Sequence, residues 1–586
     1  MFPLSLFSVP RCERVCPHDL RRRAPTTSGF VAWLNLGGPE IASQENMSEQ
    51  NAAPKTFALT IRGGTLVTAE NGAQRVDLGI NDGKIAAIQP ALPPGAVDID
   101  ASGLHLLPGG VDSHCHIEQK TSTGLTPVDN FFTAGGAALA GGTTCLIPFA
   151  CQHRGERIRD VVAAYRLVAA KSAADYALHV IVTDPAEEHA AADLEQCFSE
   201  GISSVKVYMT YDALKLRDDQ MLDVLALCRQ HGAMVMVHAE SHELIGWITR
   251  RLLAADQVAA KFHAVARPAI AEREAAHRAI TFAEFIGTPL LIVHVSSAQA
   301  AEEIARARAR GLPIFGETCP QYLELTQQCL CAPEEEGKRY LCSPPLRTEK
   351  DQTALWHALR RGDLQVVSSD HSAYNFGGGG AASKSFGGPS TPFAKVPMGL
   401  PGLETRLPLL VSGALGGKLD SLQQAVALAC ANPARLYGLY PRKGTLAVGS
   451  DADVVLVDVT RGQTISKGAL HDSLDYTPYE RMELRGLVVR TFLRGKTAFM
   501  RAAGCQPCGP PIAGAPADEL SAERGGGEFI SGGRPDLLGW SAAGERQWPD
   551  DADIVAQRCV EILGPNLDGV VANEAEGGRK RARADE

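Results

Sequence analysis

The sequence lacks several features that would place it in other classes of protein. No apolar run approaches the ~20 residues of a membrane-spanning helix, so we predict no membrane partner. Positive charge is not in excess, because 57 Lys and Arg stand against 67 Asp and Glu, and the net charge of −10 argues against a nucleic-acid partner. No GxGxxG motif follows a first strand, which leaves a dinucleotide-binding fold without support.

Paired cysteine motifs are also missing. The 15 cysteines are odd in number and scattered, and several fall in predicted core segments: Cys115, Cys145, Cys228 and Cys430. This usage predicts reduced thiols and a cytoplasmic location rather than a disulfide framework. Cys505 and Cys508 form a single CxxC in a Pro/Gly-rich stretch without a second pair, which favours a linker over a zinc knuckle.

The two ends of the chain differ from its middle. In residues 1–55 arginines follow a short apolar stretch, the reverse of a secretory signal, and we expect a disordered or targeting extension. Two interpretations stay open: a mitochondrial transit peptide, or a protein that begins at Met47. Residues 503–586 are rich in Gly and Pro with mixed charge, which predicts a mobile C-terminal tail ending in a solvated basic cluster.

Inside these ends lie two segments with the pattern of short strands. Residues 56–107 carry turn signals at Gly63-Gly64, Asn71-Gly72 and Asp82-Gly83, and residues 436–502 show a matching set of strands. We expect the two flanks to form one small composite β-sandwich domain.

Residues 108–435 alternate short Val/Ile/Leu runs with helical patterns. In residues 217–232 one predicted helical face carries Met221, Leu222, Leu225 and Cys228, with Asp218 as the cap and Gly232 as the end. Alternating strands and helices predict a parallel sheet, and about eight units predict an α/β fold of the (β/α)8, TIM-type barrel class. An open doubly wound sheet is the alternative.

Six polar residues occur at or near the ends of the predicted strands, where a barrel collects its chemistry. They are His114, His116, Lys206, His238, His294 and Asp370. Two histidines two apart on a strand share a face and can chelate one metal. The glycines before them in PGGVDSHCH are predicted to let the backbone pass tightly at the barrel mouth.

Lysine is unusual among these residues. A lysine inside the apolar run ISSVKVYM is costly as a buried ammonium, and burial favours the neutral amine. A neutral amine can react with carbon dioxide to give a carbamate, and that carboxylate could bridge two cations. The alternative is a lysine whose amine reaches solvent at a strand end. Asp370 could bind a metal and accept a proton from water, whose pKa falls towards ~7 on a metal.

The chain resembles the dihydropyrimidinase/hydantoinase branch of the metal-dependent amidohydrolases from about Phe57 to Met500. The resemblance rests on ordered blocks that include PGGVDSHCHIE, SSVKVYMTY, VHAE, VHVSS, GETCPQYL, CSPPLR, SSDHS and GLPGLETRLPLL. It implies a barrel with two divalent metal ions, with zinc expected, bridged by a carboxylated lysine and a hydroxide. By motif, His114, His116, Lys206 (as N6-carboxylysine) and Asp370 hold one metal, and Lys206, His238 and His294 hold the other.

The resemblance also implies a reaction and an assembly. Tyr211 matches the tyrosine that donates to the oxyanion, Ser343 matches the serine whose backbone meets the ring amide, and Met398 stands where the family usually has a substrate-contacting asparagine. A small cyclic amide, a dihydropyrimidine or a 5-substituted hydantoin, would open to an N-carbamoyl amino acid, with Asp370 moving the proton. The family is commonly tetrameric, so we expect a homotetramer.

Several alternatives stay open. The segment HIEQKTSTGLTPVDNF replaces a more apolar family loop that shapes the pocket for ring substituents, which leaves the preferred ring unassigned. Allantoinase is an alternative, whereas dihydroorotase fits less well because Ile117 and Glu118 stand where its pattern has an arginine. A non-catalytic scaffold of the dihydropyrimidinase-related type is the alternative of another class. The Gly-rich stretch NFGGGGAASKSFGG is expected to be a mobile lid or disordered.

Overall fold

The structure is a computed structural model, which describes residues 56–121, 124–333, 335–378, 380–502 and 518–537. The predicted extension 1–55, the Cys505/Cys508 pair and the basic C-terminal cluster lie outside the described residues. Among the described residues, no helix has both the length and the apolar character needed to cross a bilayer.

A barrel of parallel strands forms the main body. The row of paired strands is β6 (Gly110–Cys115), β7 (Thr143–Cys151), β9 (His179–Ile181), β10 (Ser204–Tyr208), β11 (Met234–His238), β12 (Leu290–Ile292), β13 (Ile314–Thr318) and β14 (Val366–Val367), with β8 (Asp175–Tyr176) beside β7. A parallel bridge between Cys115 and His371 joins the two ends of the row, and the His116 amide donates to the His371 carbonyl at 2.7 Å. The predicted (β/α)8 class is therefore confirmed.

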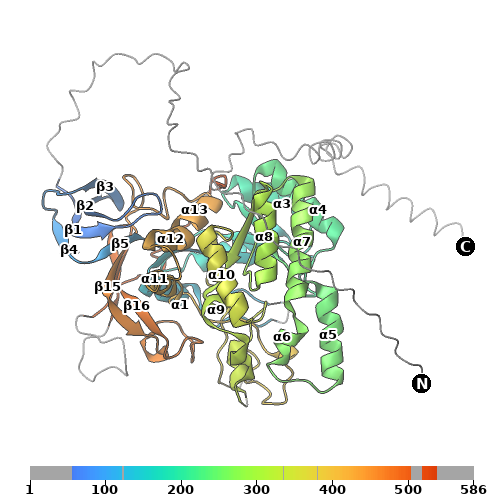
Figure 1. The fold of residues 1–586 in the computed structure, drawn as a ribbon. Helices are drawn as coiled ribbons and strands as arrows, with labels where there is room; N and C mark the ends of the chain where they lie inside the picture. Colours follow the sequence, from blue (N-terminus) through green and yellow to red (C-terminus); the bar gives the residue numbers. More distant parts are fainter. Residues whose placement is uncertain (1–55, 122–123, 334, 379, 503–517, 538–586) are drawn as a thin grey trace, which may run out of the picture. The chain divides into compact units, whose positions relative to one another are not determined.

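Helices connect the strands and cover the outside of the barrel (Figure 1). They are α1 (Phe131–Ala140), α2 (Ile158–Ala169), α3 (Ala190–Ser199), α4 (Asp218–His231), α5 (His242–Ala254), α6 (Phe262–Ala266), α7 (Ala269–Ile286), α8 (Ala298–Ala309), α9 (Pro320–Glu324), α10 (Glu349–Arg361), α11 (Arg406–Leu415), α12 (Leu422–Val426) and α13 (Asn432–Leu436).

Helix α4 can be compared with the helix predicted for residues 217–232. It ends at Gly232 as predicted, with φ of 67°, but Asp218 is its first helical residue and Arg217 precedes it as the cap. Val224 is buried in place of the predicted Leu222. The i, i+3, i+4, i+7 spacing from Met221 selects positions 224, 225 and 228, so position 222 lies off the buried face.

The two flanks build a second sheet. It contains β1 (Leu59–Leu66), β2 (Gln74–Asn81), β3 (Lys84–Gln89), β4 (Val97–Asp100), β5 (His105–Pro108), β15 (Val454–Thr464), β16 (Glu483–Leu493), β17 (Lys496–Met500) and β18 (Glu519–Leu520). The flanks meet where β5 pairs antiparallel with β15, with Val454 opposite Pro108 (Figure 1). Apolar side chains from both flanks, such as Ile61 and Phe492, share one buried cluster.

The sheet passes into the barrel through Gly109, between β5 and β6. A Cβ on Gly109 would lie 2.1 Å from Thr144 Oγ1, so glycine is required there for close packing. This position is at the start of β6, whereas the histidines follow at its end. The predicted close packing of the glycine backbone exists, but the prediction that it lies at the barrel mouth is wrong.

Residues 518–537 have a fixed course and differ from the predicted mobile tail. The Gly527 amide donates to the Ser172 carbonyl and the Gly532 amide to the Gly201 carbonyl, both just before barrel strands. Ile530 is buried in the same apolar cluster as Met234 of β11. The glycines that suggested mobility instead allow close backbone approach, since a Cβ on Gly527 would lie 1.9 Å from a carbonyl oxygen.

Candidate active site

A cavity of about 1020 Å³ opens at the carboxyl ends of the barrel strands. All the predicted site residues except Lys206 line it: His114, His116, Tyr211, His238, His294, Ser343, Asp370 and Met398. The carboxyl ends of the strands are the face where barrel enzymes build their sites. Strand order therefore brings together side chains that are up to 284 positions apart in the sequence (114 to 398).

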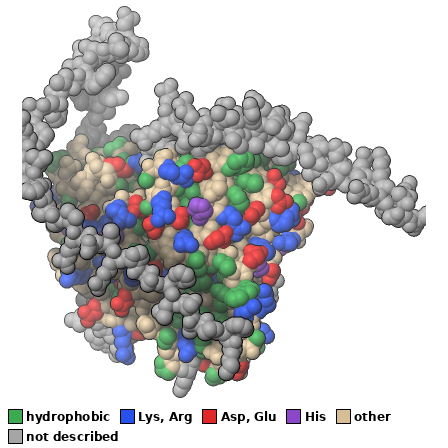
Figure 2. Space-filling model, turned by 45° about the vertical axis from the view of Figure 1, so that its right-hand side comes forward, with side chains coloured by type: hydrophobic (Ala, Val, Ile, Leu, Met, Phe, Trp, Pro, Cys, Tyr) green, Lys and Arg blue, Asp and Glu red, His purple; other side chains and the backbone are tan. Residues whose placement is uncertain are grey.

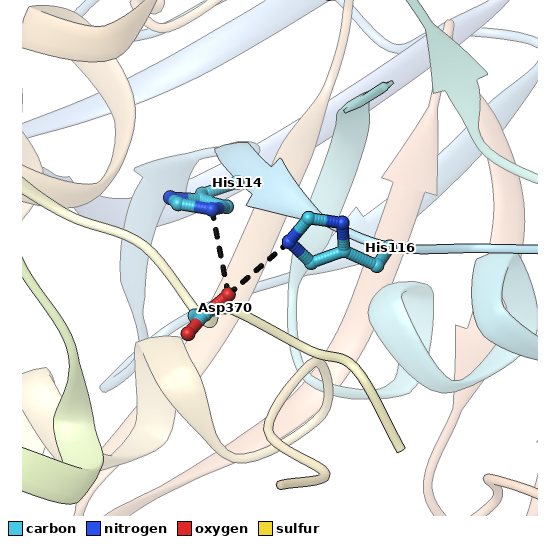
Figure 3. Close-up of side chains that lie close together, drawn as sticks. All are labelled: His114, His116 and Asp370. Atoms are coloured by element: carbon cyan, nitrogen blue, oxygen red, sulfur yellow. Dashed lines mark ion pairs between the residues drawn. The ribbon is translucent and has the colours of Figure 1, made fainter. Parts of the chain in front are cut away.

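Three of these side chains form a cluster that can hold a metal ion. The Nε2 atoms of His114 and His116 each lie 3.4 Å from the same carboxylate oxygen, Oδ1 of Asp370 (Figure 3). The possible ligand atoms of the three residues all lie within 4.8 Å of one another. Two imidazoles and one carboxylate facing a common point are a typical donor set for zinc and its neighbours.

Two further histidines face each other beside this cluster. His238 ends β11 and His294 follows β12, and Nδ1 of His238 lies 2.9 Å from Nε2 of His294. The ring of His294 is also 5.4 Å from the ring of His114, measured between centroids. The second pair of nitrogens therefore adjoins the first cluster and offers a second place for a cation.

Lys206 lies between the two groups. Its side chain is completely buried in β10, and Nζ is 3.3 Å from Nε2 of His114. No carboxylate among the described residues lies within ion-pair distance of this amine. Burial lowers the pKa of Lys206 to about 8, although Glu317 and Asp370 oppose the shift. The neutral amine is thus accessible near neutral pH, as carbamate formation requires.

The charge states of the histidines suit metal binding. Burial lowers the pKa of His114 and of His294 well below the usual value, and the neighbouring Lys206 adds to the effect. Burial also lowers the pKa of His238, against the opposing carboxylate of Glu240. Neutral imidazole is the form that binds metals, so these rings need not lose a proton first.

The acid in the cluster is held in its ionised form. Burial alone would raise the pKa of Asp370, but His114 and His116 outweigh it, and the pKa lies below its usual value. A carboxylate is the form that can both bind a cation and accept a proton from water.

Backbone strain gathers at the mouth of the barrel. Four of the eight described residues other than glycine with positive φ are found there: Glu118 (48°), Tyr211 (71°), His294 (40°) and Asp370 (49°). Non-glycine residues adopt this conformation at a cost, and the surrounding structure must hold them in it. His294 and Asp370 each lie just beyond the end of a strand, and the positive φ directs their side chains into the cavity.

The sequence interpretation missed two residues that orient ligands of the first cluster. Oε1 of Glu317 on β13 lies 2.6 Å from Nδ1 of His114, the Glu317 side chain is fully buried, and burial raises its pKa to about 8. Gln119 places Oε1 2.6 Å from Nδ1 of His116. Such partners fix the ring orientation and the tautomer of a metal-binding histidine. Glu317 lies in the GETCPQYL block, so the signal was present but carried no assigned role.

Two buried ion pairs support the second pair of histidines. Glu240 accepts from Nε2 of His238 at 2.7 Å and pairs with Arg267. Glu272 accepts from Oγ and the amide of Ser296, two residues after His294, and pairs with Arg347 at 3.1 Å. The Arg347 guanidinium also donates to the Arg267 carbonyl, which joins the two ion pairs into one network. We name these four residues, Glu240, Arg267, Glu272 and Arg347, the buried ionic network.

The predicted substrate-binding residues lie around the floor of the cavity, which is the part where the four histidines and Asp370 converge. The guanidinium carbon of Arg267 is 5.0 Å from the centroid of the Tyr211 ring, and burial raises the pKa of Tyr211 while Arg267 opposes the shift. Oγ of Ser343 lies 3.2 Å from Nε2 of His263. Met398 is partly buried and packs against the apolar group that contains Leu341 and Val396.

The Gly-rich segment beside the cavity has a defined course. The Lys384 amide donates to the Asn375 carbonyl, and its buried amine donates to the Leu341 carbonyl at 2.8 Å. Disorder was therefore the wrong alternative for residues 375–378 and 380–388, and Phe386 and Gly387 of this segment line the cavity.

Comparison with known proteins gives consistent matches over the same region. Residues 105–498 match the amidohydrolase family. The chain is 41% identical over 440 residues to a D-hydantoinase of Rhizobium radiobacter, an alignment that covers 75% of this chain and 94% of the relative. It is 40% identical over 442 residues to the D-hydantoinase of Geobacillus stearothermophilus, with 74% and 92% covered.

Solved structures agree with these relatives. The structure of a dihydropyrimidinase from Brevibacillus agri NCHU1002 superposes with a TM-score of 0.75 at 38% identity. The superposition covers 81% of this chain and 99% of that one.

Proposed function

We propose that this chain, which belongs to the amidohydrolase family and is a hydrolase of carbon–nitrogen bonds in cyclic amides, opens dihydropyrimidine or 5-substituted hydantoin rings. The product is an N-carbamoyl amino acid, formed when water adds to the ring carbonyl and the ring C–N bond breaks. The observation that carries the proposal is the convergence of His114, His116 and Asp370 beside the His238–His294 pair in one cavity.

We assign the donor groups to two divalent cations, with zinc as the expected metal. His114, His116, Asp370 and Lys206, as N6-carboxylysine, would hold one, and Lys206, His238 and His294 would hold the other. When bound, such cations supply hydroxide at neutral pH and polarise the carbonyl under attack. The neutral state of the buried imidazoles and the lowered pKa of the Lys206 amine support this assignment.

Four residues of the chain carry the remaining work. Asp370, ionised in its buried position, accepts the proton of the attacking water and delivers it to the ring nitrogen that leaves. The Tyr211 hydroxyl, kept protonated by its raised pKa, donates to the carbonyl oxygen as that oxygen gains negative charge. Ser343 holds the ring amide through its backbone, and Met398 contacts the ring in the same way.

The same chain is proposed to assemble as a homotetramer. Large apolar side chains are exposed along α5, α6 and α7, among them Trp247 and Val265 at 52% each. Figure 2 shows hydrophobic patches among charged residues on the face that carries these helices. Apolar surface of this kind commonly marks an interface between protein chains. Sedimentation velocity of the purified chain tests the tetramer, and a monomeric species would contradict it.

The direct test of the function is ring opening by metal-loaded protein. The rings to compare are dihydrouracil, neutral 5-substituted hydantoins, allantoin and dihydroorotate, and release of the N-carbamoyl product is followed by chromatography. We expect turnover of one or both of the first two classes. Turnover of allantoin alone would overturn the assigned ring, and a purified protein with neither metal nor activity would favour the scaffold alternative.

A further inference from the structure

The cavity is larger than a five- or six-membered ring needs. Pockets for whole drug-sized ligands measure roughly 300–1,000 Å³, and this cavity has about 1020 Å³. The ring must sit at the floor, where the histidines and Asp370 converge. The remaining space therefore lies between the ring and the rim and is available to the substituent on the ring.

Two basic side chains line the rim on one side of this space. Lys120 follows β6 in the loop after His116, and His153 follows β7. The strands β6 and β7 are paired neighbours, so the two loops leave the barrel side by side. The loops also touch, because the side chain of Gln119 contacts the thiol of Cys151.

The acidic side chains near this rim, Glu118 and Glu156, accept hydrogen bonds from backbone amides. Glu118 accepts from the Phe131 amide at 3.0 Å, which caps α1. Glu156 accepts from the His153 amide at 2.9 Å and so holds the turn of its own loop. Asp370 at the floor is the only carboxylate among the described residues that line the cavity.

Neither basic side chain is used by the protein itself. Within the described ranges, the Lys120 amine and the His153 ring make no hydrogen bond or ion pair, and Lys120 is exposed to solvent. A cation and a ring N–H that lie at the same rim without a carboxylate partner can together bind an anion. We name this pair, Lys120 and His153, the basic rim.

We propose that the basic rim selects rings whose substituent ends in a carboxylate, such as 5-(2-carboxyethyl)hydantoin. The ring form of an acidic amino acid is thus the substrate class, and the product is the corresponding N-carbamoyl acidic amino acid. The inference rests on the proposed function, because it places the ring at the floor. The carboxylate takes no part in bond breaking and contributes only binding energy and orientation.

The experiment compares two rings of the same shape on the full, metal-loaded protein. The first is 5-(2-carboxyethyl)hydantoin and the second is its neutral amide, 5-(2-carbamoylethyl)hydantoin. At low ionic strength we expect kcat/KM to be about threefold to tenfold higher for the carboxylate, mostly through KM, because exposed charge pairs have modest strength. The preference should shrink at about 1 M salt, where the Debye length falls to about 3 Å.

Variants locate the effect. Lys120→Met should lower kcat/KM for the carboxylate ring about threefold to fivefold and leave the amide ring unchanged, and Lys120→Glu should reverse the preference. His153→Ala should act in the same direction. Lys171→Met is the matched control, since Lys171 is an exposed lysine just after α2, at the opposite end of the barrel, and we expect no change with either ring.

The outcomes separate the two proposals. Equal kcat/KM for the two rings, or equal losses for both in Lys120→Met, would overturn the basic rim while the proposed function stands. Turnover of neither ring, nor of any other cyclic amide, would overturn the proposed function and this inference with it.

Discussion

The floor and the rim of the cavity are built in different ways. At the floor, charged or metal-binding side chains are buried and several have a dedicated partner, as His114 has in Glu317 and His238 has in Glu240. At the rim, Lys120 and His153 stand on loops without such partners in the described part of the chain. The floor therefore fixes which bond can be broken, and the rim can change without disturbing that chemistry.

Energetics sharpen the comparison. Removing one member of a buried ion pair leaves an uncompensated charge and costs roughly 3–5 kcal/mol, whereas exposed pairs contribute little. Substitutions at the floor should thus affect metal binding, stability and every substrate together. Substitutions at the rim should affect one class of substrate.

The largest effect is expected at Lys206. The variant Lys206→Ala removes the amine whose carbamate would bridge the two metal ions, and we expect metal content and activity to fall together. Metal ions supply several kcal/mol of transition-state stabilisation, so the loss should be about a thousandfold or more in kcat/KM. Elemental analysis of the purified variant and ring-opening rates provide the measurement. Propionate in the buffer should restore part of both, because its carboxylate fits where the carbamate would stand.

One outcome would contradict this prediction. A Lys206→Ala protein that keeps full metal and full activity would remove the bridging role. Lys171→Met serves as the control for the loss of a lysine as such, and it should bind metal and turn over the ring like the unaltered chain.

The second-largest effect is expected when the buried ionic network is disrupted. Arg267→Met removes a cation whose partner Glu240 is fully buried and touches His238, so we expect a loss of about 3–5 kcal/mol in the free energy of unfolding. Metal affinity should fall about 10- to 100-fold, because Glu240 would no longer be held against the ring. Denaturant unfolding and metal titration measure the two quantities.

A surface ion pair provides the control for this variant. Arg217 pairs with Asp219 at 2.7 Å, with side chains that are 70% and 65% exposed. Arg217→Met should change neither the unfolding midpoint nor the metal affinity measurably. If both variants behaved alike, the network would have no special role in holding the floor.

A smaller and pH-dependent effect is expected at His263, which contacts Ser343. Its buried ring donates to the Cys342 carbonyl at 2.8 Å, and burial, aided by Arg267, lowers its pKa to about 3. Between the unfolded value near 6.5 and the folded value near 3, the unfolded chain binds a proton that the native chain does not. Stability from this group is therefore complete above pH 6.5 and is lost as the pH falls.

The variant His263→Gln keeps an N–H donor for the Cys342 carbonyl and removes the titration. By pH 5 the unaltered chain should have lost about 2 kcal/mol more of its unfolding free energy than the variant, relative to pH 8. Unfolding curves of both proteins at each pH measure this difference, and parallel pH profiles would contradict it. Other titrating groups are common to both proteins and cancel.

The comparison of floor and rim also explains what could be predicted from the sequence. The ligands could be found because each follows an apolar run that marks a buried strand, and a barrel brings such strand ends together. The partner of His114 could not, because Glu317 is 203 positions away and meets it only when the strands close into a ring. The return of residues 518–537 to the barrel was missed for the same reason, since its glycines indicate mobility until the backbones they approach are known.

The smallest effect is expected on the far side of the mouth. Lys395 also lines the cavity and is exposed, but it belongs to a short helical turn, Phe393–Lys395, whose Phe393 amide donates to Val258, between α5 and α6. These helices follow β11, four places along the row of eight strands from β6, and so lie across the barrel from Lys120.

A carboxylate held at the basic rim is then too distant for a strong contact with Lys395, and water screens the remaining electrostatic attraction. Lys395→Met should change the preference for the carboxylate ring by less than about twofold, against about threefold to fivefold for Lys120→Met. Equal effects of the two lysines would mean that the anion senses the charge of the whole mouth instead of one built subsite, and the floor alone would then determine how the ring is placed.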